Sequence, residues 1–273
     1  MKRNLCFLAF FALGISLFAQ SVEDFIISIE SGGITIIDYI GSEKEVIIPG
    51  DIQGVPVTAI GEDAFAGQQL VAVTIPKGVV SIGKGAFAVN QISFAAIPET
   101  VSTIENSAFA MNQLCSVTLP GKIVVIEDNA FSDNHLTSIT IPRGVKSIGR
   151  MAFYNNRLTN VELSPGVTVI NASAFAFNQI NSINIPSTVV TIGDDAFAGN
   201  KITSISIPDG INSIGISAFA DNQLTRIQIP ENAKMSDDAF DDSFINFYRR
   251  NGKRAGAYTL NSNTWAFARR SVY

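Results

Sequence analysis

The sequence predicts a β-rich solenoid, a stack of short coils with a cap at each end, and three observations support this fold class. The dipeptide Ala-Phe recurs along most of the 273-residue chain at a fixed spacing of 22 residues. Alternating apolar residues precede a proline in nearly every unit, which indicates a short strand that the proline ends. Hairpin patterns replace the repeat at both ends. A strict period of this length is typical of stacked structural repeats.

Each repeated unit is expected to form one coil, of which the unit from 136 to 157 is an example. Ile139 and Ile141 alternate with polar residues, so they form the inward side of a short strand, and Pro142 removes a donor and ends it. The large residue at the end of each unit is expected to fill the interior. It is Phe65, Phe87, Phe109, Phe131, Phe153, Phe175, Phe197 and Phe219, with Phe240 following after 21 residues.

An asparagine column accompanies the phenylalanine column. It consists of Asn90, Asn112, Asn134, Asn156, Asn178, Asn200 and Asn222. A buried amide needs hydrogen-bond partners, so these side chains are expected to form a ladder that bonds backbone groups of the next coil. Because a solenoid repeats its scaffold in every unit, the column is interpreted as scaffold and not as a binding site.

The repeated pattern resembles the BspA-like, or treponemal-type, leucine-rich repeats, whose typical unit reads L-x-x-I-x-I-P-x-x-V-x-x-I-G-x-x-A-F-x-x-C. The resemblance extends from about Val46 to Phe240, with asparagine in place of the usual cysteine. It implies a leucine-rich-repeat solenoid of about nine coils with a parallel sheet on the concave face. It also implies a secreted or cell-surface protein, since such proteins are linked to adhesion to host matrix proteins and to other bacteria. The first coil, between Ile48 and Ile60, is expected to carry a longer loop.

Residues 1–20 have the pattern of a secretory signal peptide. Two basic residues precede an apolar run from Leu5 to Phe18, and cleavage is expected after Ala19 or Gln20. The run is shorter than the roughly 20 residues that span a bilayer. Export to the cell surface, the medium or the periplasm is therefore expected, without a transmembrane segment in the mature chain. Removal of the leader leaves Cys115 as the one cysteine, so no intrachain disulfide is expected.

The mature chain is expected to divide into three parts. Residues 21–45 form an N-terminal cap, because two alternating apolar runs flank the turn around Gly32. Residues 46–242 form the solenoid. Residues 243–273 form a basic, aromatic C-terminal cap, in which Trp265 lies beside the predicted hairpin turn. Both caps are needed because the open ends of a solenoid are apolar.

Composition and spacing argue against catalysis, metal binding and nucleic-acid binding. The formal net charge is −5, which does not favour nucleic acid. The sole histidine, His135, lies in a column that elsewhere carries glutamine, lysine or arginine. The sequence therefore offers no set of residues for a zinc site or a catalytic triad. A β-solenoid enzyme acting on carbohydrate would need paired carboxylates on neighbouring strands, and Glu162 is single. The protein is therefore expected to be no enzyme and to need no cofactor.

The candidate binding residues are the outward side chains of the predicted strands. They give a flat, nearly uncharged face, and Phe94 and Arg226 are of types enriched in binding hot spots. The sequence favours an exported module that binds a protein or glycan ligand, with a periplasmic structural or assembly protein as the alternative. The residues are Phe94, Thr118, Ser138, Thr140, Asn160, Glu162, Asn184, Ser204, Ser206, Arg226 and Gln228.

The C-terminal segment offers a second candidate surface, because it has no acidic residue from Ser243 to Tyr273. Aspartates precede it directly at Asp237, Asp238, Asp241 and Asp242. Two interpretations stay open: local charge pairing at the cap, which is weak when exposed, or a patch for an anionic envelope surface. The basic residues are Arg249, Arg250, Lys253, Arg254, Arg269 and Arg270.

Overall fold

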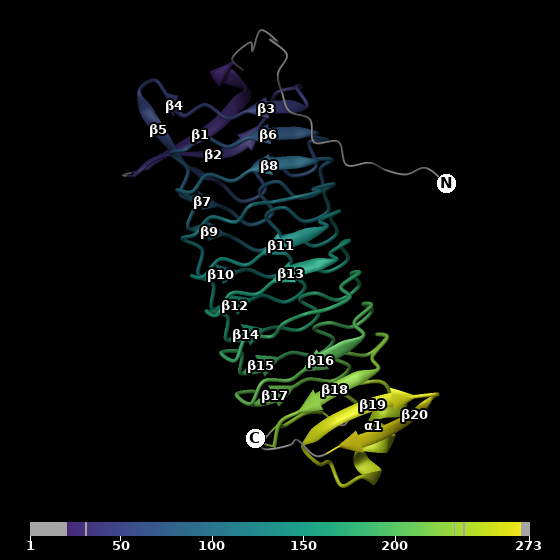
Figure 1. The fold of residues 1–273 in the computed structure, drawn as a ribbon. Helices are drawn as coiled ribbons and strands as arrows, with labels where there is room; N and C mark the ends of the chain where they lie inside the picture. Colours follow the sequence, from purple (N-terminus) through teal and green to yellow (C-terminus); the bar gives the residue numbers. More distant parts are fainter. Residues whose placement is uncertain (1–20, 31, 232, 237, 269–273) are drawn as a thin grey trace, which may run out of the picture.

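The structure, a computed structural model, describes residues 21–30, 32–231, 233–236 and 238–268. This part of the chain forms a β-solenoid of about nine stacked turns between two caps, with parallel sheets and few helices, as predicted (Figure 1). The predicted signal peptide lies outside the described residues. No helix of the described part is long and apolar enough to cross a membrane.

One side of the stack carries the strands that the alternating isoleucines predict. Neighbouring coils pair in parallel, with Ser138 opposite Asn160 and Thr140 opposite Glu162. The middle residue of each three-residue strand from β8 onward is buried and its neighbours are exposed, the alternation of a half-buried strand. These strands are β3 (Glu45–Ile47), β6 (Ala72–Thr74), β8 (Phe94–Ala96), β11 (Ser138–Thr140), β13 (Asn160–Glu162), β16 (Ser204–Ser206) and β18 (Arg226–Ile229).

This side is divided into three short sheets, where the sequence predicts a single one. The coil of Ser116 contributes only a bridge to Phe94. The segment around Asn184, which the structure describes in full, forms no strand. Serine and asparagine compete with strand ladders through local side-chain bonds, and here the Ser182 hydroxyl donates to Asn181 Oδ1 at 3.2 Å.

A second line of parallel strands, which we call the second ladder, follows the Val-x-x-Ile part of the units, which the sequence pattern did not identify as strands. It is divided into two sheets between Ile104 and Val125. Most of its strands are two residues long, too short to show an alternating period. In this ladder the isoleucine carbonyl accepts from the following coil, as when the Gly193 amide donates to Ile170 at 2.8 Å and the Gly215 amide to Ile192 at 2.9 Å. The strands are β5 (Val55–Ile60), β7 (Ser81–Ile82), β9 (Thr103–Ile104), β10 (Val125–Ile126), β12 (Ser147–Ile148), β14 (Val169–Ile170), β15 (Thr191–Ile192) and β17 (Ser213–Ile214).

The phenylalanine column fills the interior as predicted. From Phe65 to Phe240 the rings of successive coils stack with centroids 5.1 to 5.7 Å apart. Every ring in the column is buried. The stack therefore joins all coils into one continuous apolar core.

Left-handed turns flank each phenylalanine from Phe65 to Phe219. In the coil of Phe153, Met151 has φ 55° and Asn155 has φ 51°. Glycine, which adopts this conformation without strain, occupies equivalent positions in some coils, for example Gly199 with φ 66°. Other coils place a larger residue there, as with Val89 at φ 58°.

The asparagine column is hydrogen-bonded, and it is buried except at Asn222, which is half-buried. Its side chains bond the preceding coil and not the next one. Asn156 Nδ2 donates to the Phe131 carbonyl of the preceding coil at 2.9 Å and to the Phe153 and Tyr154 carbonyls of its own coil at 3.3 and 3.2 Å. Its Oδ1 accepts from the Leu136 amide at 3.0 Å. The same arrangement recurs at Asn90, Asn112, Asn134, Asn178, Asn200 and Asn222.

The N-terminal end is covered by an antiparallel hairpin of β1 (Phe25–Glu30) and β2 (Gly33–Tyr39), preceded by the short helix η1 (Val22–Asp24). Strand β2 pairs in parallel with β5 and so begins the second ladder. Tyr39 stacks on Phe65 with ring centroids 5.5 Å apart, which extends the interior stack into the cap. The longer loop of the first coil is a small hairpin in which β4 (Asp51–Ile52) pairs with β5.

The C-terminal end is covered by helix α1 (Asp242–Arg250) and a hairpin of β19 (Gly256–Asn261) and β20 (Thr264–Ala268). The hairpin was predicted and the helix was not. Phe244 of α1 contacts Phe240, the last ring of the stack, with centroids 5.2 Å apart, and Trp265 with centroids 5.0 Å apart. Strand β19 pairs antiparallel with β18, so the hairpin continues the sheet of the last coils.

Candidate functional site

The predicted binding residues lie together on one surface, which we call the strand face. It consists of the outward side chains of β3, β6, β8, β11, β13, β16 and β18, with the equivalent residues of the coils at Ser116 and Ser182. Phe94 has 60% of its surface exposed. The other exposed members are Thr118, Ser138, Thr140, Asn160, Glu162, Asn184, Ser204, Ser206 and Arg226.

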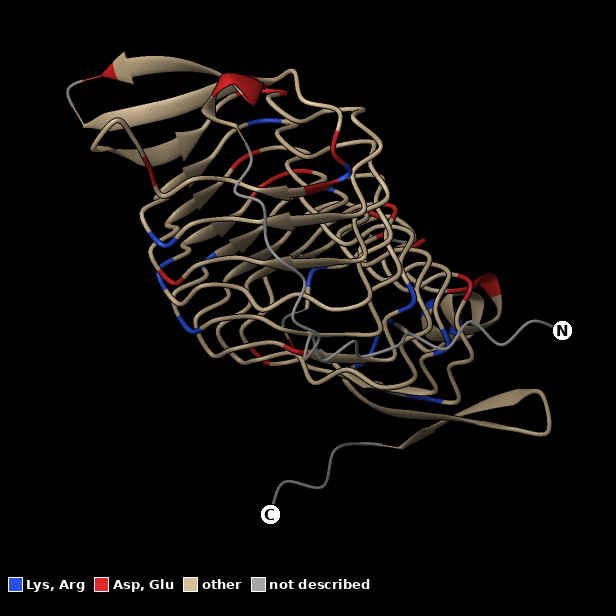
Figure 2. Ribbon diagram, turned by 90° about the horizontal axis from the view of Figure 1, so that it is seen from above, with Lys and Arg blue, Asp and Glu red and all other residues tan. Residues whose placement is uncertain are grey.

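The strand face is organised in two rows that run along the stack. Pairing sets Ser204 opposite Arg226 and Ser206 opposite Gln228, each residue in line with its equivalent one coil away. Most strands of the stack are free of charged residues, which gather mainly in the turns and caps (Figure 2). The rows therefore present hydroxyl and amide groups at the spacing of stacked strands, about 4.8 Å.

Glu162 is the one carboxylate among the predicted binding residues, and it is hydrogen-bonded within the face. The Thr140 hydroxyl of the preceding coil donates to Glu162 Oε2 at 3.1 Å. None of the predicted residues supplies a second acid beside it, as glycoside hydrolysis would need. Within the described ranges, no group of three or more histidine, cysteine, aspartate or glutamate side chains could hold a metal ion.

Gln228 lies in the row of Ser206, but it is more covered than the other predicted residues of the face. It is half-buried, because β19 pairs with β18 and places Ala257 opposite it. Among the residues that the structure describes, its Nε2 is buried without a hydrogen-bond partner. Arg226, two residues earlier on the same strand, stays exposed.

Four of the predicted basic residues can be placed. Arg249 and Arg250 end helix α1, where positive charge is favourable, and Lys253 and Arg254 follow; all four are exposed. Arg249 Nη2 lies 3.5 Å from Asp238 Oδ1, an exposed pair of the kind that the local-pairing interpretation expects. The remaining two, Arg269 and Arg270, lie outside the described residues.

His135 and Cys115 are the two remaining residues with chemistry that the sequence singled out. His135 is half-buried, and burial together with the nearby positive charge of Arg157 lowers its pKa. Cys115 is disulfide-bonded in the structure, whereas the sequence without its leader predicts no intrachain disulfide.

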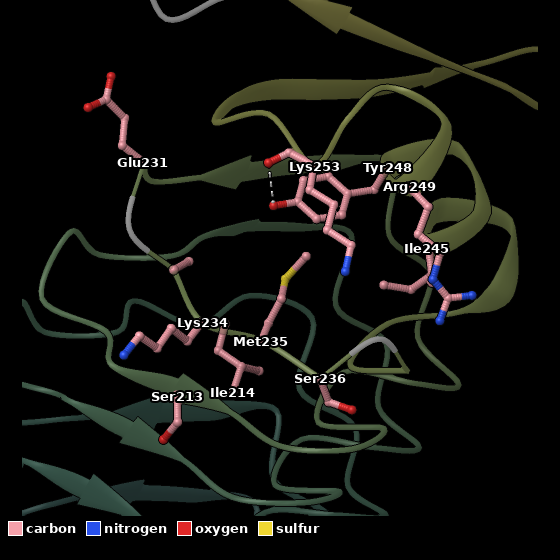
Figure 3. A pocket seen from close by; sticks show the side chains of 11 residues that line it. Ser213, Ile214, Glu231, Lys234, Met235, Ser236, Ile245, Tyr248, Arg249 and Lys253 are labelled. Carbon is pink, nitrogen blue, oxygen red and sulfur yellow. Dashed lines mark hydrogen bonds between the residues drawn. The ribbon is translucent and has the colours of Figure 1, made fainter.

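A cavity of about 530 Å³ between the last coil and α1 was not predicted (Figure 3). Lys234 and Met235 line it from the last coil, and Ile245 and Tyr248 line it from the helix. The sequence signals were the shortened spacing before Phe240 and the helical spacing of Phe244 and Tyr248. Neither signal could show that the two segments enclose a space.

Comparison with known proteins identifies the repeat. The profile of the BspA-type leucine-rich repeat region matches residues 44–157 and 124–246 with six copies, which together cover more than half of the chain. The chain belongs to this family. A comparison with curated proteins found no match.

Solved structures of leucine-rich repeat proteins share the fold of this chain at low sequence identity. A leucine-rich repeat protein from Bacteroides ovatus aligns with a TM-score of 0.59 and 21% identity, over 80% of this chain and 67% of that one. The leucine-rich repeat protein of T. pallidum gives 0.56 and 22%, over 85% and 95%. A leucine-rich cell surface protein from Faecalibacterium prausnitzii gives 0.56 and 22%, over 84% and 87%. At these identities the likeness is one of fold.

Proposed function

We propose that this chain is an exported binding module that engages a protein or glycan through the strand face, at the cell surface or in the medium. The observation that supports the proposal most is the difference between the inward and the exposed positions of each coil. Inward positions repeat the same few residues, whereas the exposed positions of the strand face change from coil to coil through phenylalanine, serine, threonine, asparagine, glutamate and arginine. Scaffold must repeat in every unit of a solenoid, but a recognition surface need not.

The chemistry of the strand face favours a ligand recognised by hydrogen bonds and shape. Its rows of hydroxyls and amides donate and accept, and only Glu162 and Arg226 are charged among the exposed predicted residues. Phe94, exposed near the N-terminal end of the face, is a candidate apolar contact. An interface with so few charges should depend weakly on salt. An extended glycan or a flat protein surface fits these properties.

Substitutions on the strand face test the proposal directly. Thr118→Arg with Thr140→Arg places two bulky cations in one row, on coils that follow one another. Thr103→Arg with Val125→Arg is the matched control, because it adds the same groups to exposed positions of β9 and β10 on the second ladder. Binding is measured on immobilised host extracellular-matrix proteins and bacterial cell-wall glycans. We expect the first pair to weaken binding at least tenfold and the control to leave it unchanged; equal binding by both would contradict a strand-face site.

The location of the protein in the cell can be tested separately from its binding. One of the similar structures is described as a cell surface protein, and such a place would leave the strand face accessible to ligands outside the cell. Protease treatment of intact cells, followed by immunodetection, should remove the protein if it is exposed at the surface. Protection in intact cells with loss after outer-layer disruption would instead support the periplasmic structural or assembly protein.

A further inference from the structure

The second ladder ends at the last coil with an open backbone edge. Met235 takes the place that isoleucine holds in the earlier coils and forms a parallel bridge with Ile214. In that bridge the Ile214 amide donates to the Lys234 carbonyl at 2.9 Å and the Ser236 amide donates to the Ile214 carbonyl at 2.8 Å. The Met235 amide and carbonyl take no part in it, and neither has a hydrogen-bond partner among the described residues.

The direction of these two groups follows from the earlier coils. The Ile170 carbonyl accepts from Gly193 and the Ile192 carbonyl from Gly215, so the backbone at this position points to the following coil. Residues that alternate along a strand direct their amides and carbonyls to opposite edges. The Met235 amide and carbonyl therefore point to where another strand of the ladder would lie, toward helix α1.

The cavity occupies the space between this edge and helix α1. Ser213, Lys234 and Met235 line it on the ladder side, and Ile245 and Tyr248 line it on the helix side (Figure 3). Its volume, about 530 Å³, is in the range of pockets that hold small ligands or short peptide segments. Ile245, Met235 and Tyr248 give it apolar walls.

Three cations and one carboxylate line the cavity, namely Lys234, Arg249 and Lys253 with Glu231. Arg249 also pairs with Asp238, which lies outside the lining, at 3.5 Å. The Tyr248 hydroxyl donates to the Lys253 carbonyl at 3.1 Å, which ties the turn after α1 to the helix beside the cavity (Figure 3). A ligand with negative side chains would gain from this arrangement, although the whole chain is acidic.

We propose that this cavity binds a short, extended acidic peptide segment of a partner protein, which adds to the ladder beside Met235. The peptide accepts a hydrogen bond from the Met235 amide and donates one to the Met235 carbonyl, as in other cases of strand addition. Acidic side chains of the peptide contact Lys234 and Lys253, and apolar ones contact Ile245. The proposal is independent of ligand binding at the strand face.

Fluorescence anisotropy with synthetic peptides tests this proposal. The probe is a fluorescein-labelled Gly-Glu-Val-Asp-Val-Gly amide, compared with a version carrying lysine at both acidic positions and with a version N-methylated at its central amides. We expect saturable binding of the acidic peptide only. N-methylation should weaken it roughly tenfold, since a blocked donor leaves the partner carbonyl unpaired.

Protein variants locate the site. Lys234→Glu with Lys253→Glu should weaken binding roughly tenfold or more, because both charge contacts become repulsive. Lys77→Glu with Lys146→Glu changes the net charge equally at exposed sites elsewhere on the solenoid and should have no effect. Circular dichroism and thermal midpoints confirm that each variant is folded. The pair Thr118→Arg and Thr140→Arg should keep peptide binding, which separates this site from the strand face.

Three results would overturn the proposal. The first is no binding of the acidic peptide up to about 1 mM, an affinity that corresponds to about 4 kcal/mol. The second is equal binding of the N-methylated peptide, which would indicate attraction of anions without strand addition. The third is displacement of the peptide by phosphatidylglycerol vesicles with the same dependence on Lys234 and Lys253, which would indicate a membrane surface as the partner.

Discussion

The substitution Asn156→Ala tests how much the hydrogen bonds of the asparagine column contribute to stability. The side chain is buried and makes four hydrogen bonds. Its loss removes the acceptor of the Leu136 amide, a buried donor, whereas the Phe131 carbonyl keeps the longer bond from Asn134 at 3.3 Å. One orphaned buried donor costs about 1–3 kcal/mol and each lost bond about 0.5–1.5 kcal/mol. We expect the free energy of unfolding to fall by about 2–4 kcal/mol.

The assay is equilibrium urea unfolding followed by circular dichroism, with Asn160→Ala as the control. Asn160 is an exposed asparagine of the neighbouring strand β13, so its substitution should change stability by about 0.5 kcal/mol or less. Asn156→Asp gives a second readout. Its carboxylate would face the Phe131, Phe153 and Tyr154 carbonyls, so the folded-state pKa is raised and the destabilisation at neutral pH is relieved as the pH falls through that pKa. Equal losses for Asn156→Ala and Asn160→Ala would refute the ladder as a source of stability.

Three further substitutions test other parts of the scaffold. Val89→Gly should raise the free energy of unfolding by about 1 kcal/mol, because it removes a branched residue from a φ of 58°, while Val80→Gly, at an exposed position without a positive φ, should lower it by a similar amount in the same urea assay. Phe153→Ala should cost about 3–5 kcal/mol by opening a gap in the ring stack, and thermal unfolding without loss of midpoint would contradict that. Because the pKa of His135 is lowered in the folded state, the folded chain binds fewer protons there than the unfolded chain does. The stability that His135 contributes is therefore present above the unfolded pKa of about 6.5 and is lost as the pH falls below it. His135→Gln should remove this loss of stability at low pH.

The repeating parts of the fold could be predicted because the residue at each repeated position has one physical role. Phenylalanine recurs in all nine units and asparagine in seven of them. Phe153 and Asn156 are both buried, as expected. The left-handed turns could not be predicted, since the residues there range from Gly199 to Val89 and share no chemical property. The stack imposes that conformation through its backbone ladders, and the local sequence does not.

Of the candidate sites too, the repeating one could be predicted from the sequence and the non-repeating one could not. The strand face could be predicted because alternation along a short strand fixes which side chains point outward, and Thr140 and Glu162 were placed together by this argument. The partial burial of Gln228 could not be predicted, because the hairpin that pairs with its strand breaks the repeat. The cavity depends on how helix α1 lies against Met235, and no periodic pattern specifies a contact between two segments that each occur once.

The direction of the asparagine bonds has a consequence for the order in which the chain folds. Each coil is closed by an amide from its successor, as when Asn156 bonds the Phe131 carbonyl and the Leu136 amide. During synthesis or passage across a membrane, the N-terminal part emerges first. A newly emerged coil therefore keeps unsatisfied backbone groups until the next one arrives, and we expect structure to form one coil behind the growing end. The last repeats, with helix α1 behind them, complete the final coils, so C-terminal truncation should destabilise the coil before the cut as well as remove those after it.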